Sequence, residues 1–259
     1  MNVRSMLRVA AAVVALALVP HAGAAEPPLV AAAADLRFAL DEIVAAYTKD
    51  SGRAVKVVYG SSGNFRRQIA DGAPFGLFLS ADEGYVLALA KEGFTVDDGV
   101  PYAVGRLALV VPEGSPLKLD ASLSDIAPAV ADGRLRKFAI ANPEHAPYGR
   151  AAQEALQRAG AWDAVASHLV LGENVSQAAQ FATSGSAQGG IVALSLALAP
   201  GALGSARHVA IPASMHLPLR QRMVLTKRAT AATREFYRYL QEPAARAVLA
   251  RYGFTLPGE

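Results

Sequence analysis

The chain has 259 residues, of which 53% are hydrophobic and 18% are charged. This balance is typical of a globular protein with a large core and excludes an intrinsically disordered chain. The formal net charge is +3 and the sequence has no cysteine, so disulfide bonds and a lipid-modified cysteine are excluded. No basic run interleaved with aromatic residues indicates nucleic-acid binding.

The first 25 residues predict a cleavable secretory signal peptide. Arg4 and Arg8 precede an apolar run at 9–19, and small residues follow at 22–25. The run is too short to span a bilayer. This segment holds two of the 25 basic residues and none of the 22 acidic ones, which leaves 23 against 22. The sequence therefore predicts a nearly neutral, soluble protein of the periplasm that is not a lipoprotein.

Strands and helices alternate after this segment. Short apolar runs predict strands, and apolar residues at helical spacing predict the helices between them. The first strands are expected at 29–34, 55–59 and 77–79, and the first helices at 36–52, at 65–70 and from Asp82 onward. This order predicts a parallel sheet with right-handed crossovers.

The pattern continues along the rest of the chain. Further strands are expected at 107–111, 138–141, 168–171, 190–192, 209–211 and 223–226. Further helices are expected at 123–131, 150–159, 175–183, 231–240 and 244–251. These units are too many for one small sheet, so the sequence predicts two α/β lobes.

Four loops follow the carboxyl ends of predicted strands, where α/β proteins place their binding sites. They lie at 34–35, 60–64, 142–149 and 172–175. Each loop leads into a helix whose first N–H groups have no acceptor within the helix. These N–H groups and the positive end of the helix dipole favour an anion.

Hydroxyl groups in these loops suit a deprotonated oxyanion, which can only accept hydrogen bonds. Ser61, Ser62 and Tyr148 offer such donors. Each serine has an alternative structural role, because serine at the start of a helix commonly caps that helix. The residues alone leave both interpretations open.

Motifs for covalent chemistry and metal binding are not matched. The segment 60–64 lacks the spacing of a G-x-S-x-G nucleophile elbow, and no histidine is placed by spacing to serve it. No Lys-Ser or Lys-Thr pair follows it, as a phosphate-binding P-loop requires. The four histidines beyond residue 25 lack metal-ligand spacing. We therefore expect no catalytic residue, no cofactor and no direct metal-ion ligand.

Several segments together resemble the ModA-type molybdate-binding proteins of ABC importers, and the resemblance covers nearly all of the chain after the predicted signal. The segments that carry it are AAAADLRFALDEI, GSSGNFRRQIADGAPFGLFLSAD, NPEHAPYGRAAQEALQRAGAW, GENVSQAA, GGIVALS and FYRYLQEPAARAVLARYGF.

The resemblance implies a two-lobed periplasmic binding protein of type II, with a mixed, mainly parallel sheet in each lobe. We expect one lobe to comprise 26–105 plus 220–259, and the other to comprise 106–219. The protein would act as a monomer, close on a tetrahedral oxyanion and deliver it to an inner-membrane ABC permease.

The resemblance also implies ligand positions. The first ligand of the family, usually a serine, falls on Asp35, and the second falls on Ser62 beside Ser61. A third falls on Tyr148, and a backbone N–H donor falls on Val175. Some members place a further tyrosine where this chain has Ala193, so that hydroxyl is missing here.

Asp35 departs from the family pattern, because a carboxylate repels a bound dianion and donates no hydrogen bond. In one interpretation its side chain caps its own helix while its backbone N–H reaches the ligand. In a second, it accepts a hydrogen bond from a protonated oxyanion such as phosphate or arsenate. In a third, the site takes an organic or cationic ligand or binds weakly.

The sequence thus predicts a non-enzymatic solute-binding protein for molybdate, and for tungstate as a dianion of similar size. The alternative within the same class is a phosphate or arsenate protein that uses Asp35 as acceptor. A hydrolase using Ser62 is the alternative from another class.

Overall fold

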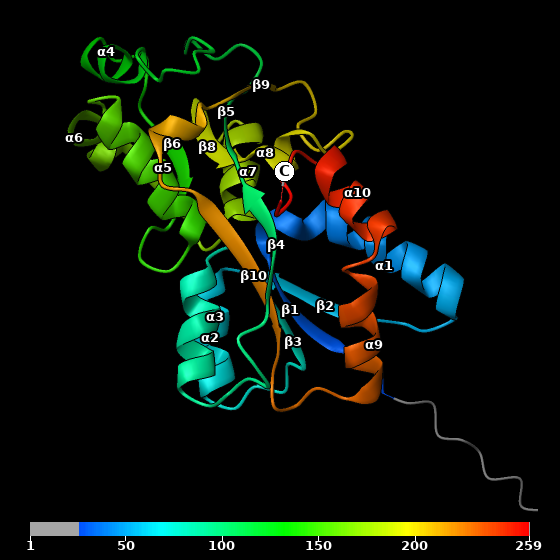
Figure 1. The fold of residues 1–259 in the computed structure, drawn as a ribbon. Helices are drawn as coiled ribbons and strands as arrows, with labels where there is room; N and C mark the ends of the chain where they lie inside the picture. The colour runs from blue at the N-terminus through cyan, green and yellow to red at the C-terminus, as the bar shows by residue number, and fades with distance from the viewer. Residues whose placement is uncertain (1–25, 259) are drawn as a thin grey trace, which may run out of the picture.

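The computed structural model describes residues 26–258, so the predicted signal peptide lies outside the described residues. Figure 1 shows two lobes, each built on a sheet with helices packed around it. None of the helices in this part of the chain combines the length and the apolar character that crossing a membrane requires.

The first lobe is built on a five-stranded sheet in the order β2-β1-β3-β10-β4. β1 pairs in parallel with β2 and β3, whereas β10 pairs antiparallel with β3 and β4. The strands are β1 (Leu29–Ala33), β2 (Lys56–Gly60), β3 (Leu77–Ser80), β4 (Val100–Gly105) and β10 (Leu219–Leu225).

The second lobe repeats this mixed architecture in the order β7-β6-β8-β5-β9. β6 pairs in parallel with β7 and β8, and β5 pairs antiparallel with β8 and β9. The strands are β5 (Leu107–Val111), β6 (Phe138–Ala141), β7 (Leu169–Gly172), β8 (Gly189–Ala193) and β9 (Arg207–Ala210).

Helices connect the strands of both sheets. In the first lobe these are the short 3-10 helix η1 (Ala34–Leu36), α1 (Arg37–Ser51), α2 (Ser62–Ala70), α3 (Glu83–Lys91), α9 (Ala231–Tyr239) and α10 (Pro243–Arg251). In the second they are α4 (Ile126–Ala131), α5 (Pro147–Arg158), α6 (Trp162–Val165), η2 (Ala166–His168), α7 (Val175–Thr183), α8 (Leu194–Ala197) and η3 (Ala213–Met215).

The chain passes between the two sheets twice. It leaves the first sheet at the end of β4, enters the second at β5, and returns through β10, as Figure 1 shows. The strands before Arg106 and from Leu219 onward therefore share one sheet. This arrangement is the two-lobed, type II binding-protein fold with mixed sheets that the sequence predicted.

The hydrophobic cores explain why the sequences of most strands are nearly continuous apolar runs. One cluster of buried residues fills the second lobe, and two clusters cover the two faces of the first sheet. Because helices cover both faces, the central strands bury side chains on both sides, whereas the edge strands β2, β7 and β9 are partly exposed. β5 and β6 are buried along their entire length.

Several elements differ from the sequence prediction, among them β4, α5 and α4. β4 was not predicted, because Pro101 interrupts an otherwise short apolar pattern at an edge of the sheet, where proline is tolerated. α5 begins at Pro147 rather than at residue 150, since proline is favoured in the first helical turn. α4 begins at Ile126 rather than at residue 123.

Candidate functional site

A small cavity lies between the lobes. Its volume of about 10 Å³ is far below the roughly 300–1,000 Å³ of pockets that hold drug-sized ligands, so it suits only a compact ligand. The residues that line it are Ala33, Ala34, Asp35, Gly60, Ser61, Ser62, Ala81, Ala146, Pro147, Tyr148, Asn174 and Val175. All five site residues predicted from the sequence are among them.

The cavity gathers the N-terminal ends of helices from both lobes. η1 and α2 contribute from the first lobe, and α5 and α7 from the second. No lysine or arginine belongs to this lining. The attraction for an anion therefore comes from helix dipoles and N–H groups rather than from a cationic side chain.

Ser62 is the first residue of α2, and its side chain is fully buried. Its Oγ accepts a hydrogen bond of 2.9 Å from the N–H of Ala81. An accepting hydroxyl keeps its own proton for another partner. No acceptor for this proton is found among the described residues, so it is available to a ligand in the cavity.

Ser61 occupies the N-cap position of α2, but its side chain makes no capping hydrogen bond. Its Oγ lies 3.0 Å from Nδ1 of His145 in the second lobe. His145 Nε2 in turn lies 3.5 Å from a carboxylate oxygen of the exposed Glu173. The His145 ring therefore contacts the Ser61 hydroxyl, a contact that the spacing along the sequence did not predict.

Val175 is the first residue of α7, where a backbone N–H has no acceptor within the helix. The preceding Asn174 caps the helix, because its side chain accepts from the N–H of Gln177 at 3.1 Å. With this cap in place, the N–H of Val175 is the first-turn donor that remains beside the cavity.

Asp35 lies in η1 and is 1% exposed. Its Oδ2 accepts hydrogen bonds from Gln221 Nε2 at 2.6 Å and from the Tyr148 hydroxyl at 3.0 Å. Its Oδ1 is buried without a hydrogen-bond partner among the described residues. The side-chain hydrogen bonds of Asp35 run to donors on β10 and α5, so they give the capping interpretation no support.

Burial raises the pKa of Asp35 to about 6, against the opposing effect of these two hydrogen bonds. Gln221 lowers the pKa more than Tyr148 does, and the nearby backbone N–H groups of Asp35 and Leu36 lower it further. Removal from water is the larger effect because it disfavours the charged form. The carboxyl therefore takes up a proton more readily than an exposed aspartate.

Tyr148 links this cluster across the lobes. Its hydroxyl donates to Asp35 and also accepts from Gln221 Nε2 at 3.2 Å. Burial, together with the charge of Asp35, raises its pKa well above the usual range, so the hydroxyl stays protonated. A Cβ atom at Gly105 would stand 2.1 Å from this hydroxyl oxygen, so the cluster requires glycine at the end of β4.

Further hydrogen bonds join the two lobes around the cavity. The hydroxyl of Ser195 donates to the carbonyl oxygen of Asp35 at 2.7 Å, and that of Ser176 donates to the carbonyl oxygen of Ala34 at 2.9 Å. The N–H of Gly63 donates to the carbonyl oxygen of His145 at 3.0 Å. The structure is therefore the closed form, in which both lobes contact each other directly.

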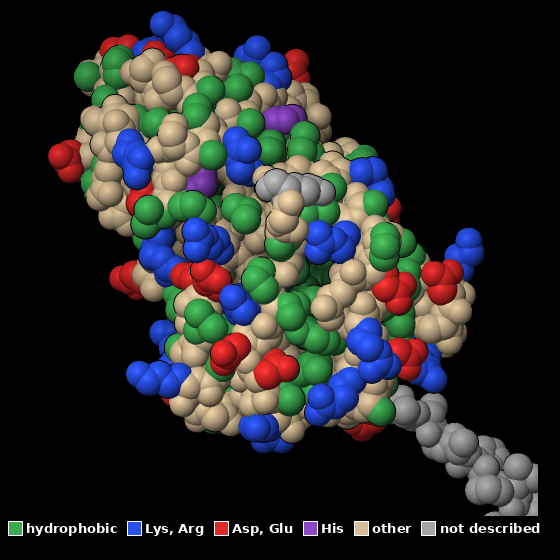
Figure 2. All heavy atoms as spheres, viewed as in Figure 1, with side chains coloured by type: hydrophobic (Ala, Val, Ile, Leu, Met, Phe, Trp, Pro, Cys, Tyr) green, Lys and Arg blue, Asp and Glu red, His purple; other side chains and the backbone are tan. Residues whose placement is uncertain are grey.

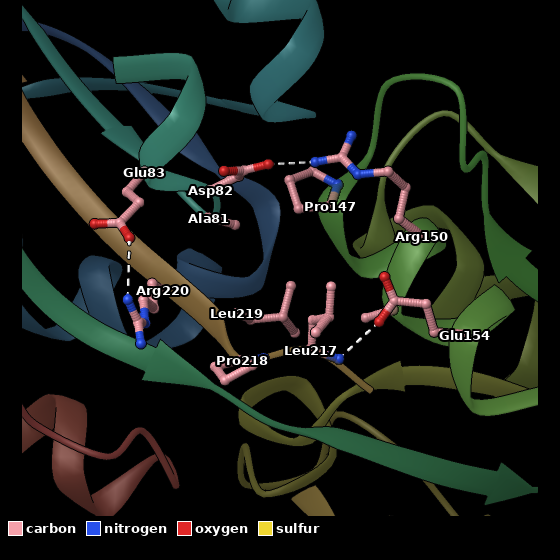
Figure 3. Close-up of a pocket in the computed structure, with 11 residues that line it drawn as sticks. Ala81, Asp82, Glu83, Pro147, Arg150, Glu154, Leu217, Pro218, Leu219 and Arg220 are labelled. Carbon is pink, nitrogen blue, oxygen red and sulfur yellow. Dashed lines mark hydrogen bonds and ion pairs between the residues drawn. The ribbon is translucent and has the colours of Figure 1, made fainter. Parts of the chain in front are cut away.

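A second, larger hollow of about 220 Å³ opens beside the cavity, and both share Ala81 and Pro147. Figure 3 shows Arg150 of the second lobe paired with Asp82 of the first at its edge. Arg150 also donates to the Tyr85 hydroxyl at 2.7 Å. These contacts close the outer side of the interface between the lobes.

Charged side chains of both signs are interspersed over the face shown in Figure 2, without a large patch of one sign. Among residues 26–258, no group of three or more His, Cys, Asp or Glu side chains is placed to hold a metal ion. The chemistry that the cavity offers is hydrogen-bond donation to a small anion.

Sequence reasoning located the walls of the cavity but missed some of its contacts. Gln221 and Ser195 were not predicted, and no local motif marks them. His145 was weighed only as a possible metal ligand, although it lies within the predicted loop 142–149. Ala193 is buried and leaves its position without a hydroxyl, as predicted.

Comparisons with known proteins agree with this geometry. A family model described as "Bacterial extracellular solute-binding protein" matches residues 28–255. The Molybdate-binding protein ModA of Azotobacter vinelandii is 36% identical over 237 residues, covering 88% of this chain and 89% of the relative. The Molybdate-binding protein ModA of Rhodobacter capsulatus is 35% identical over 248 residues, covering 95% and 93%. The solved periplasmic molybdate-binding protein of Azotobacter vinelandii superposes with a TM-score of 0.80 at 31% identity, covering 89% of this chain and 99% of that one.

Proposed function

Because this chain belongs to the bacterial extracellular solute-binding proteins, and among them to the ModA-type molybdate-binding proteins, we propose that it binds molybdate in the cavity between its lobes. The observation that carries this proposal is the convergence of Asp35, Ser61, Ser62, Tyr148 and Val175 on one small cavity at four helix N-termini.

The donors of this cavity match the needs of a tetrahedral dianion. Ser62 has a free hydroxyl proton, Val175 has a free first-turn N–H, and Ser61 can donate when His145 presents a protonated Nδ1. Each of these groups can donate to an oxygen atom that accepts only. Ligand oxygen atoms bound by both lobes would stabilise the closed form over the open one.

Tungstate is proposed as a second ligand, because it has the same charge and shape as molybdate. The protein would work in the periplasm and deliver the anion to an inner-membrane ABC permease that recognises the closed form. The family consists of solute-binding transport proteins rather than enzymes. The hydrolase alternative lacks support from the geometry, because Ser62 contacts Ala81 and the histidine contacts Ser61 instead.

A protonated oxyanion such as hydrogen phosphate or arsenate is the second candidate. The observation that favours it is Asp35 Oδ1, which is buried without a donor. In its ionised form this atom could accept the hydrogen bond that a protonated oxyanion offers and that molybdate cannot offer.

Titration calorimetry of the mature protein with molybdate, tungstate, sulfate and phosphate tests both candidates. We expect molybdate and tungstate to bind at micromolar concentration or below. A ligand at a hundred times its dissociation constant adds about 2.7 kcal/mol of stability, which raises the melting temperature by roughly 5–10 °C for a chain of this size. Binding of phosphate but not of molybdate would favour the second candidate, and no binding of either metal oxyanion would overturn the proposal.

A further inference from the structure

The two oxygen atoms of the Asp35 carboxyl have different surroundings. Oδ2 accepts from both Gln221 and Tyr148, whereas Oδ1 is buried without a partner among the described residues. Since Asp35 lines the cavity, Oδ1 is the oxygen left for a ligand. A buried polar atom without a partner is costly, so this atom is expected to gain one when the cavity is filled.

The hydrogen-bond directions around Oδ2 decide where a proton on this carboxyl would lie. The Tyr102 hydroxyl donates to Gln221 Oε1 at 2.6 Å, so the amide NH₂ of Gln221 faces Asp35. Tyr148 donates to the same oxygen atom. An oxygen atom that already accepts two hydrogen bonds disfavours a proton of its own, and the proton belongs on Oδ1.

We propose that Asp35 binds the dianion in its neutral form, with the proton on Oδ1 donated to an oxygen atom of the ligand, so that each molybdate is bound together with one proton from solvent. This inference rests on the proposed function and assigns the donor in its site. A neutral carboxyl removes the repulsion that a carboxylate would exert on the ligand and supplies a donor where the chain lacks a serine.

Among the groups around Asp35, its own carboxyl is the one expected to take up the proton that is bound with the ligand. Tyr148 on α5, Tyr102 on β4, Gln221 on β10 and Ser195 on α8 surround it, and all are uncharged. No charged side chain is among the influences on its pKa, which burial raises to about 6. A dianion placed beside it would raise this pKa further.

The other titratable groups near the cavity, His145 and Glu173, lie beside Ser61. His145 contacts Ser61 through Nδ1 and approaches Glu173 through Nε2. Proton uptake by His145 is the alternative that the experiment has to distinguish from uptake by Asp35. Substituting Asp35 and His145 one at a time shows which of the two takes up the proton.

Calorimetric titration with molybdate at pH 7.5, in buffers of different ionisation enthalpy, measures the number of protons bound with the ligand. For the wild type we expect a value approaching one, and a dissociation constant that rises about tenfold per pH unit between pH 7 and 8. Asp35→Asn presents an amide NH₂ in place of the carboxyl O–H, so it should bind molybdate with no proton uptake and no such pH dependence. His145→Gln should retain the uptake.

The results separate this inference from the proposed function. Molybdate binding by the wild type without proton uptake would overturn the role of Asp35 and leave the proposed function standing. Uptake that persists in Asp35→Asn and disappears in His145→Gln would also overturn it. If Asp35→Asn fails to fold, the proton count of the wild type and of His145→Gln decides. No molybdate binding between pH 5 and 8 would overturn the proposed function itself.

Discussion

The backbone N–H of Gly63 in α2 donates a hydrogen bond of 3.0 Å to the carbonyl oxygen of His145 in the opposite lobe. A Cβ atom at Gly63 would stand 2.6 Å from that carbonyl oxygen and 2.9 Å from the Tyr85 hydroxyl. Real Cβ atoms do not approach backbone oxygen so closely. The two lobes can therefore meet at this point only because residue 63 has no side chain.

Gly63→Ala is expected to weaken molybdate binding by at least about tenfold. The added methyl group separates the lobes in the closed form, while alanine is favourable within a helix. Calorimetry measures the affinity, and thermal unfolding without ligand serves as the control. The unliganded melting temperature should change little, because the clash with the His145 carbonyl exists only when the lobes are closed and the Tyr85 hydroxyl, at the end of its side chain, can shift aside. Unchanged affinity would contradict this account of closure.

Ser62→Ala is expected to weaken molybdate binding by roughly ten- to a hundredfold. A hydrogen bond to a charged group contributes about 1.5–3 kcal/mol, and the substitution removes the hydroxyl proton that Ser62 offers to the ligand. It also leaves the N–H of Ala81 without its acceptor. The exposed Ser186 supplies a control, since Ser186→Ala should leave the affinity unchanged. If both variants bound molybdate with equal affinity, Ser62 would not be a ligand-binding residue.

Arg150→Gln is expected to speed ligand release by up to about fivefold. The Arg150–Asp82 pair joins the lobes at a partly exposed position, where ion pairs contribute about 0.2–1 kcal/mol and are screened by salt. Stopped-flow release kinetics at low and high salt measure the effect. Arg134→Gln breaks an Arg–Asp pair within the second lobe and should not change the release rate. A release rate of Arg150→Gln equal to that of the wild type at low salt would exclude a role in closure.

Asp35→Asn is expected to stabilise the unliganded protein at neutral pH. Burial raises the pKa of Asp35 from its ordinary 3.8 to about 6, so the folded state binds the proton more tightly than the unfolded state. Stability therefore falls as the pH rises from about 4 to 6 and changes no further through this group above pH 6. The difference of about two pKa units corresponds to roughly 3 kcal/mol.

Denaturant unfolding of both proteins between pH 4 and 8 measures this effect. The free energy of unfolding of Asp35→Asn should exceed that of the wild type by a margin that opens between pH 4 and 6 and then stays constant. Parallel stability curves over this range would show that Asp35 is not buried in the dominant unliganded form.

The sequence predicted the fold and the walls of the cavity because both depend on local patterns. Apolar runs marked most strands, and the loops at 60–64 and 142–149 carried serine, tyrosine and helix starts at strand ends. Asp82 was predicted to open a helix, and its side chain caps α3 by accepting a hydrogen bond from the N–H of Gly84. These features arise within a few residues of each other, so one sequence suffices to find them.

The contacts between distant segments could not be predicted in the same way. Gln221 meets Asp35 because β10 returns from the second lobe and shifts its register against β4 between Gln221 and Arg222. Such an irregularity redirects a side chain without a sequence signature. His145 reaches Ser61 only when the lobes close, and spacing along the chain gives no information about this approach.

The missing side chain at Gly105 has a consequence for the history of the family. A methyl group on the Cα atom of Gly105 would collide with the Tyr148 hydroxyl and with Gln221 Nε2. A lineage that replaces this glycine must also move or lose the ends of the Tyr148 and Gln221 side chains. The two positions are therefore expected to change together among descendants of a common ancestor, and an aspartate at the position of residue 35 should occur where both glycine and tyrosine are kept.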